Sequence, residues 1–189
     1  RDFAWLYPWQ DQAAFLDGHV RAFAHFGCVP NRILYDNLKA AVRRLVGSDR
    51  ELSTRFAALA AHYGFGCRFA RPRTGHDKGG VEGRGRGIRL QHLSPVPVAP
   101  TLAEISQQLM ARIERRLDRP RRRGGPTIRA LWEEERPRML PLPEHAHDPG
   151  ILDEEVPVDR QAKIRVRTAR YSVPSTWAGL VVRVWLYAD

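Results

Sequence analysis

The chain has 189 residues, 43% of them apolar, which is enough for the core of one domain and a smaller second one. It contains no run of eighteen apolar residues and no leader of basic then apolar residues, so we expect neither a membrane span nor secretion. With 31 Lys and Arg against 21 Asp and Glu, its net charge of +10 indicates a polyanion such as nucleic acid as partner, with a solvated Arg-rich surface as the alternative.

The first half of the chain alternates helical and strand patterns. Apolar residues at helical spacing predict helices over residues 11–26 and 51–63. Short apolar runs predict strands over residues 33–35 and 67–70, and the first of them ends at Asp36. This alternation predicts an α/β layer with short, buried strands.

Glycine-rich sequence interrupts this pattern after the second strand. Residues 72–80 are typical of a loop, and Glu82 stands where a helix is expected to begin. A capping box that starts at Thr101 predicts a further helix to about residue 117, and a short helix is expected over 128–135. The Arg-rich connector RPRRRGGP lies between these two helices.

The last part of the chain has a different pattern. Residues 141–150 are a proline-rich linker, and apolar and polar residues alternate through 151–189. We therefore expect residues 1–140 and 151–189 to be separate domains, the second a small all-β barrel. Tyr171, Trp177 and Trp185 fall in the alternating pattern and are interpreted as core residues rather than as platforms for stacked bases.

The two cysteines, Cys28 and Cys67, are far apart and form no C-x-x-C motif. This pattern predicts reduced thiols inside the fold and favours neither a zinc site nor a catalytic cysteine. The chain begins with Arg1 in the apolar stretch RDFAWLYPW, which is typical of a strand within a sheet. We expect these residues to be a piece of a longer protein.

Two acids hold positions suited to metal binding. Asp36 lies at a strand tip before Asn37, and Glu82 lies at a helix start after a basic, glycine-rich loop. Mg²⁺ prefers carboxylate oxygens, and two such ions about 4 Å apart assist phosphoryl transfer by stabilising the attacking and leaving oxygens. In the structural alternative, Asp36 forms a turn with Asn37, and Glu82 complements the positive end of a helix.

Two motifs carry a family resemblance, GCVPNRILYDNLKAAV and, after it, FAALAAHYGFGCRFARPRTGHDKGGVEG. In this order they resemble the catalytic core of IstA-type insertion-sequence transposases, a branch of the DDE transposase and retroviral integrase superfamily. The resemblance spans residues 2–140 and implies an RNase H-like fold, truncated at its N-terminus, and metal-dependent cleavage and transfer of DNA strands. It implies that Asp36 and Glu82 are the second and third catalytic acids, which bind two Mg²⁺ or Mn²⁺ ions.

The resemblance extends to DNA contacts and partners. The resemblance implies that Arg71, Arg73 and Lys78 lie against DNA phosphates, and the arginine cluster over residues 112–123 predicts the same of Arg121, Arg122 and Arg123. Expected partners are the element ends and target DNA, further copies of the chain, and an AAA+ ATPase helper in the bacterial cytoplasm, where the chain would associate with the nucleoid. The stretch ARYSVPSTWAGLVVRVW resembles the small β-barrel that follows the core in this family and in Mu-type transposases.

One departure from the family pattern keeps a second hypothesis open. The first acid of the triad should lie on the first strand of the fold, and no residue before Asp36 fits it. The alternative is a non-catalytic DNA-binding or assembly module, such as the remnant of a degraded transposase. An unrelated RNase H-like nuclease, a third possibility, would lack the barrel.

Overall fold

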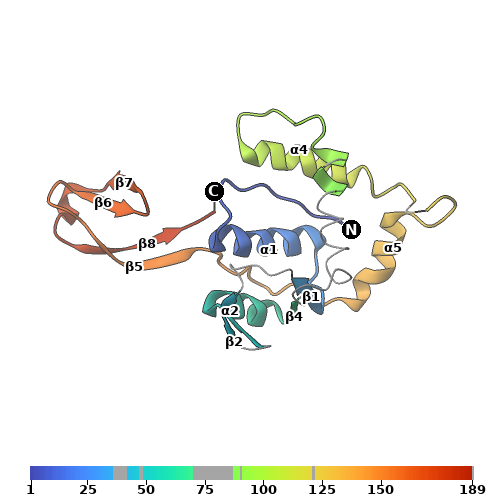
Figure 1. Cartoon of the computed structure of the whole chain (residues 1–189), viewed down its shortest axis with the longest axis horizontal. Helices are drawn as coiled ribbons and strands as arrows, with labels where there is room; N and C mark the ends of the chain where they lie inside the picture. Colours follow the sequence, from blue (N-terminus) through green and yellow to red (C-terminus); the bar gives the residue numbers. More distant parts are fainter. Residues whose placement is uncertain (36–41, 47–48, 70–86, 90, 121, 189) are drawn as a thin grey trace.

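The computed structural model describes residues 1–35, 42–46, 49–69, 87–89, 91–120 and 122–188. These residues form a mixed α/β structure with open sheets, as expected, but the strands β1 (Arg32–Tyr35) and β4 (Gly66–Phe69) are not buried as predicted, because alternate residues of each are exposed. In its body, helix α1 lies between helices α4 and α2 (Figure 1). The three helices are α1 (Gln12–Phe26), α2 (Thr54–Tyr63) and α4 (Leu102–Glu114). No helix among the described residues is long and apolar enough to cross a bilayer.

Helix α1 begins and ends close to the predicted residues. The Oδ1 atom of Asp11 accepts a hydrogen bond of 2.9 Å from the backbone N–H of Ala14 and so caps the first turn. Gly27 ends the helix with a φ of 69°, a left-handed conformation that glycine adopts without steric cost. Both signals are local, which explains why the sequence locates this helix well.

Helix α2 begins later than the predicted start at residue 51. The side chain of Ser53 caps it, and the residues before form strand β3 (Asp49–Leu52), which pairs antiparallel with β2 (Val42–Val46). The sequence does not predict this pair, because β3 consists mostly of charged residues and lacks an apolar alternation.

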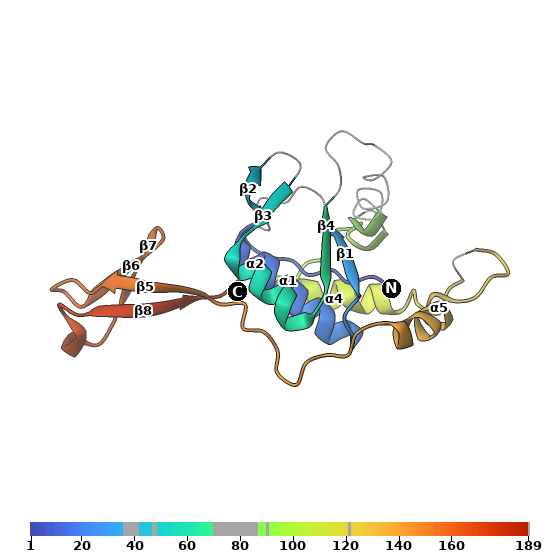
Figure 2. The same cartoon turned by 90° about the horizontal axis from the view of Figure 1, so that it is seen from below.

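Strands β1 (Arg32–Tyr35) and β4 (Gly66–Phe69) form a two-stranded parallel sheet, close to the bounds that the sequence predicts. Figure 2 shows them side by side against the helices. The main core between these strands and helices is rich in aromatic rings, and Phe56 and Leu59 are fully buried in it. Burial of a side chain such as Phe56 stabilises the fold by about 1.5–3 kcal/mol. The buried members of the core are Leu16, Phe23, Val29, Tyr35, Phe56, Leu59, Ala60, Tyr63 and Phe65.

The N-terminal stretch is not the strand that its apolar pattern predicts. Residues 1–7 pair with no strand among the described residues and run along α4 (Figure 1). The backbone N–H of Leu6 donates to Ser106 Oγ at 2.9 Å, and that of Ala4 donates to Met110 Sδ at 3.4 Å. Side chains of α4 thus replace the backbone partners of a strand. The apolar side chains of the stretch cover a second core cluster formed by Leu109, Met110 and Ile113.

The second half of the body follows the predicted helices. Thr101 Oγ1 accepts a hydrogen bond of 3.2 Å from the backbone N–H of Glu104, as the capping box predicts. Helix α4 ends at Glu114, earlier than the predicted residue 117, and α5 (Ile128–Glu135) has the predicted bounds. The 3-10 helix η1 (Arg136–Arg138) continues from α5.

The C-terminal residues form two antiparallel pairs, one of β5 with β8 and one of β6 with β7. The four strands and one 3-10 helix of this part are β5 (Ile151–Pro157), β6 (Lys163–Val166), β7 (Ala169–Ser172), η2 (Ser175–Trp177) and β8 (Val181–Leu186). The pairs share a small valine-rich core but form open sheets, and no barrel closes among the described residues. The strands agree with the predicted alternation, whereas the barrel is not confirmed.

The linker, residues 141–150, contains neither helix nor strand and forms hydrogen bonds with α2. His62 Nε2 lies 2.9 Å from the carbonyl oxygen of His145, and Tyr63 Oη accepts from the backbone N–H of His147 at 3.3 Å. These contacts hold the linker against the body. The division into domains at residues 140 and 151 stays a prediction.

Candidate functional site

The ends of β1 and β4 define the candidate site. In the parallel register Arg32 lies opposite Gly66, and Tyr35 lies opposite Phe69. The carboxyl ends of parallel strands meet at one edge of a sheet, so the chain leaves Tyr35 and Phe69 at the same edge. Asp36 is the residue after Tyr35, and the segment that contains Glu82 begins after Phe69.

Asp36, Glu82, Arg71, Arg73, Lys78 and Arg121 lie outside the described residues. The predicted proximity of the two carboxylates therefore stays a prediction. Both are hard oxygen donors, the type that suits Mg²⁺ or Mn²⁺. Among the described residues, no group of three His, Cys, Asp or Glu side chains could hold a metal ion.

A hydrogen bond between the half-buried His19 and the buried Tyr35 supports the end of β1. His19 on α1 lies with Nδ1 2.7 Å from the carbonyl oxygen of Phe15 and with Nε2 2.9 Å from Tyr35 Oη. Because the carbonyl can only accept, Nδ1 carries the proton, and Nε2 of the neutral ring accepts from the Tyr35 hydroxyl. Burial lowers the pKa of His19 and, with a smaller contribution from Cys67, raises that of Tyr35, which favours this neutral pair. Nothing in the sequence distinguishes His19, because only its helical position can be read there.

Aromatic rings pack around the same strand end. The Tyr35 ring contacts Phe56 edge to face with centroids 5.2 Å apart, and its centroid lies 5.6 Å from that of Phe69. Phe15 packs on Tyr35 with centroids 5.9 Å apart. Aromatic pairs of this kind stabilise the fold beyond their buried area. The last residue before Asp36 is thus held by its hydroxyl and by its ring.

The cysteines take no visible part in chemistry. Both are free, Cys28 buried and Cys67 half-buried on β4. Burial raises the pKa of both thiols, which disfavours the thiolate needed for nucleophilic attack. The prediction of two unpaired thiols inside the fold is confirmed.

The basic connector is described in part. Arg122 and Arg123 are exposed within the turn between Pro120 and Thr127, which form an isolated antiparallel bridge. Arg112, on α4, is half-buried, and its Nη1 donates a hydrogen bond to the carbonyl oxygen of His92 at 2.6 Å. Arg122 and Arg123 are therefore the members of the predicted DNA-binding set whose exposure the structure describes.

Three aromatic residues of the C-terminal segment are exposed, which corrects the interpretation that they are core residues. Tyr171 is 55% exposed, Trp177 43% and Trp185 50%. Trp185 is exposed because β8 belongs to an open pair, so only alternate residues such as Val182 and Val184 face the core. Tyr171 lies on β7, which is exposed along its whole length, and Trp177 lies in the 3-10 helix η2. An alternating pattern does not distinguish a strand covered on both faces from one covered on a single face.

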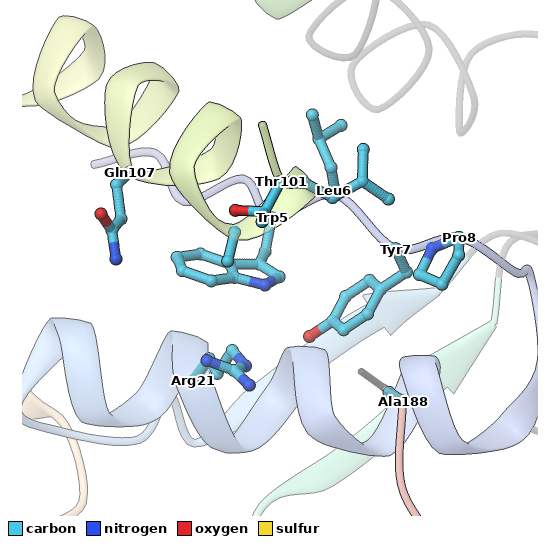
Figure 3. Close-up of a pocket in the computed structure, with 10 residues that line it drawn as sticks. Trp5, Leu6, Tyr7, Pro8, Arg21, Thr101, Gln107 and Ala188 are labelled. Atoms are coloured by element: carbon cyan, nitrogen blue, oxygen red, sulfur yellow. The ribbon is translucent and has the colours of Figure 1, made fainter. Parts of the chain in front are cut away.

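A cavity of about 420 Å³ lies between the N-terminal stretch, α1 and α4 (Figure 3). The guanidinium of Arg21 lies 4.7 Å from the ring centroid of Trp5 and donates to Asp17 Oδ2 at 2.5 Å. The Tyr7 hydroxyl donates to the same Asp17 oxygen at 2.6 Å, and burial raises the pKa of Tyr7. The charges at this cavity thus neutralise one another, which favours a structural role over acid or base catalysis.

No family model matches the chain. It is 32% identical over 187 residues to a transposase of Aminobacter aminovorans, a match that covers 97% of this chain and 36% of that protein. It is 29% identical over 185 residues to the transposase for insertion sequences IS1326/IS1353 of Pseudomonas aeruginosa, with 97% and 36% covered. It is 30% identical over 183 residues to the transposase for insertion sequence element IS21 of Pseudomonas aeruginosa, with 96% and 47% covered. The chain thus spans between about a third and a half of the length of these relatives.

Proposed function

We propose that this chain is part of an insertion-sequence transposase of the IstA type and that it supplies two acids of a DDE catalytic site. The observation that carries the proposal is the similarity of nearly the whole chain to proteins named as transposases. The shared edge of β1 and β4 supports it, since both acid-bearing segments start there. In this proposal the α/β body belongs to an RNase H-like core, and the C-terminal strands belong to a small barrel domain.

The proposed reaction is attack of water or a DNA 3′-hydroxyl on a phosphodiester, which cleaves or joins strands. Asp36 and Glu82 would hold Mg²⁺ or Mn²⁺, which in such sites activates the attacking oxygen and stabilises the leaving one. The contribution of the described residues is positional. The His19 and Tyr35 pair and the rings around it fix the strand end from which Asp36 follows.

The proposed substrates are the element ends and target DNA. The net charge of +10 and the exposed Arg122 and Arg123 suit phosphate contacts that do not depend on base sequence. Assembly as a homo-oligomer on DNA and cooperation with an AAA+ ATPase, in the bacterial cytoplasm, belong to the same proposal.

A non-catalytic DNA-binding or assembly module is the second candidate, and the roles of two early acids favour it. Asp11 caps α1 with one oxygen and pairs with Arg167 through the other, at 2.8 Å. Asp17 accepts from Tyr7 and Arg21. Both acids thus have structural partners, and neither is placed to act as the first catalytic acid.

The experiment that separates the two candidates is strand transfer in vitro with a labelled element end and a target plasmid. It uses the 189-residue chain and, where its gene encodes a longer protein, that protein extended upstream. The catalytic proposal expects Mg²⁺-dependent or Mn²⁺-dependent joining by the extended protein and none by the chain alone. DNA binding by both proteins without joining by either would support the non-catalytic module.

A further inference from the structure

The hairpin formed by β6 and β7 places two arginines directly opposite each other. Arg165 lies opposite Arg170 in the antiparallel register, and Lys163 lies opposite Ser172. Residues that are directly opposite share one face of the pair, with Cβ atoms about 5 Å apart. Side chains alternate along a strand, so Lys163 shares the face of Arg165. One face of this short hairpin therefore carries three positive charges.

The other face of β6 faces the core, which fixes the direction of the basic face. Ile164 and Val166 are buried against Val156 and Val158. A slip by one residue would bury the arginines and expose the core residues, so the hydrophobic pattern holds the register. The cationic side chains are thus kept on the outside of the hairpin.

No ion pair compensates the two opposed arginines among the described residues. Arg165 and Arg170 are both exposed, and neither has a carboxylate partner among the described side chains, which do not include that of Glu154. Lys163 Nζ donates to Gln161 Oε1 at 3.3 Å, a neutral acceptor. Like charges directly opposite each other destabilise a strand pair. The repulsion between Arg165 and Arg170 therefore destabilises the hairpin when no anion is bound. An anion bound between the two arginines would remove this destabilisation.

We propose that Lys163, Arg165 and Arg170 form a binding surface for the phosphate backbone of DNA. The inference rests on the proposed function, because that function makes DNA the polyanion. Guanidinium groups bind phosphate oxygens through charge-assisted hydrogen bonds, and a phosphate between two of them converts their repulsion into two attractions. Contacts of this kind position a duplex and do not read its sequence.

A partly exposed ion pair links the hairpin to the body. Arg167, in the turn of the hairpin, pairs with Asp11 at 2.8 Å, and Asp11 also caps α1. The hairpin is thus tied to the helix that carries His19, which supports the end of β1. This contact would favour one position of hairpin-bound DNA relative to the edge from which Asp36 follows.

The test measures binding of a fluorescent duplex of arbitrary sequence by anisotropy over a series of salt concentrations. The variant Arg165→Gln with Arg170→Gln removes the opposed pair. The matched control, Arg160→Gln with Arg183→Gln, removes the same charge from exposed positions of the same C-terminal segment. Each lost phosphate contact should reduce the slope of log K against log salt by about 0.9. Because Arg165 and Arg170 share one phosphate in this proposal, we expect the first variant to flatten the slope by about 0.9 and the control to change it clearly less.

A charge reversal separates a binding defect from a folding defect. Arg170→Glu places a carboxylate opposite Arg165, so we expect a higher Tm without DNA and weaker DNA binding than in the double Gln variant. Equal effects of the double variant and its control would overturn the hairpin surface and leave DNA binding standing. Absence of DNA binding by the unaltered chain would overturn both the hairpin surface and the proposed function.

Discussion

Tyr35 and Phe69 end two parallel strands in register, with ring centroids 5.6 Å apart. The segments that contain Asp36 and Glu82 therefore start side by side, although these acids are 46 positions apart in the sequence. The common edge at which β1 and β4 end is the structural basis of the candidate site.

Tyr35→Phe should destabilise the fold without disturbing its packing. The substitution keeps the ring and removes the hydroxyl that donates to His19 Nε2 at 2.9 Å. A buried acceptor without a partner costs about 1–3 kcal/mol, which urea unfolding measures. Tyr171→Phe, at an exposed tyrosine, is the control and should change stability by less than about 0.5 kcal/mol. Equal effects of the two substitutions would show that the buried hydrogen bond contributes nothing.

Stability should fall as the pH is lowered from 7.5 to 5.5. Burial lowers the pKa of His19, His25 and His147, with the charge of Arg1 adding to the effect at His25 and that of His62 at His147. Below the usual histidine pKa of about 6.5 the unfolded chain then binds more protons than the folded one. The free energy of unfolding therefore keeps the contribution of these neutral histidines above that pH and loses it as the pH falls further.

His147→Gln tests this pH dependence at one site. It removes a ring whose centroid lies 5.4 Å from that of His62, and it should reduce the loss of stability between pH 7.5 and 5.5. His145→Gln, at an exposed neighbour in the linker, is the matched control. Chemical denaturation at the two pH values gives the comparison. An unchanged difference in the His147 variant would contradict the assignment.

Asp11 should show separable contributions as a helix cap and as an ion-pair partner. Asp11→Ala removes both and should cost about 1–2 kcal/mol, whereas Asp11→Asn keeps a capping oxygen and should cost less than about 1 kcal/mol. Arg167→Gln removes only the ion pair and should resemble Asp11→Asn. Thermal unfolding of the three variants measures these differences. A cost of Arg167→Gln as large as that of Asp11→Ala would assign the main contribution to the ion pair.

Local signals made the positions of the helices predictable, whereas the pairing of strands and the exposure of side chains could not be predicted from them. The capping box at Thr101 located the start of one helix, and apolar residues at helical spacing located the helix that Asp11 caps; both signals are local. The exposure of Trp185 depends on whether a further sheet covers β8, which its own alternation does not encode. The N-terminal stretch shows the same limit, because an extended apolar segment can be satisfied by side chains of α4 as well as by a strand.

The candidate site divides in the same way. The strand end before Asp36 was predictable from a short apolar run followed by turn residues. The support from His19 was not, because a histidine on a helix has no signature of its partner in the sequence. The parallel pairing of β1 with β4 joins distant segments, and only the folded chain displays it.

The Arg-rich connector should contribute to the salt dependence of DNA binding. If the chain contacts six phosphates, log K should fall with log salt at a slope of roughly −5. Arg121→Ala, Arg122→Ala and Arg123→Ala together should flatten that slope by up to about 3, since each contact contributes about 0.9. Anisotropy titrations at several salt concentrations measure it. An unchanged slope would assign these arginines to a solvated connector.

In the protein extended upstream, Asp36→Asn and Glu82→Gln should each abolish strand joining. Each substitution removes a carboxylate charge that would hold Mg²⁺ or Mn²⁺ and leaves the basic residues in place, so DNA binding should stay nearly intact. Asp77→Asn, at another acid of the segment before Glu82, is the matched control and should keep joining. Strand transfer and duplex binding are measured on the same preparations. The 189-residue chain itself should bind DNA without joining it, because two carboxylates lack the third that positions a second ion. Joining at the unaltered rate by both variants would make Asp36 and Glu82 ordinary turn and helix-start residues, and the DDE assignment of this edge would be wrong.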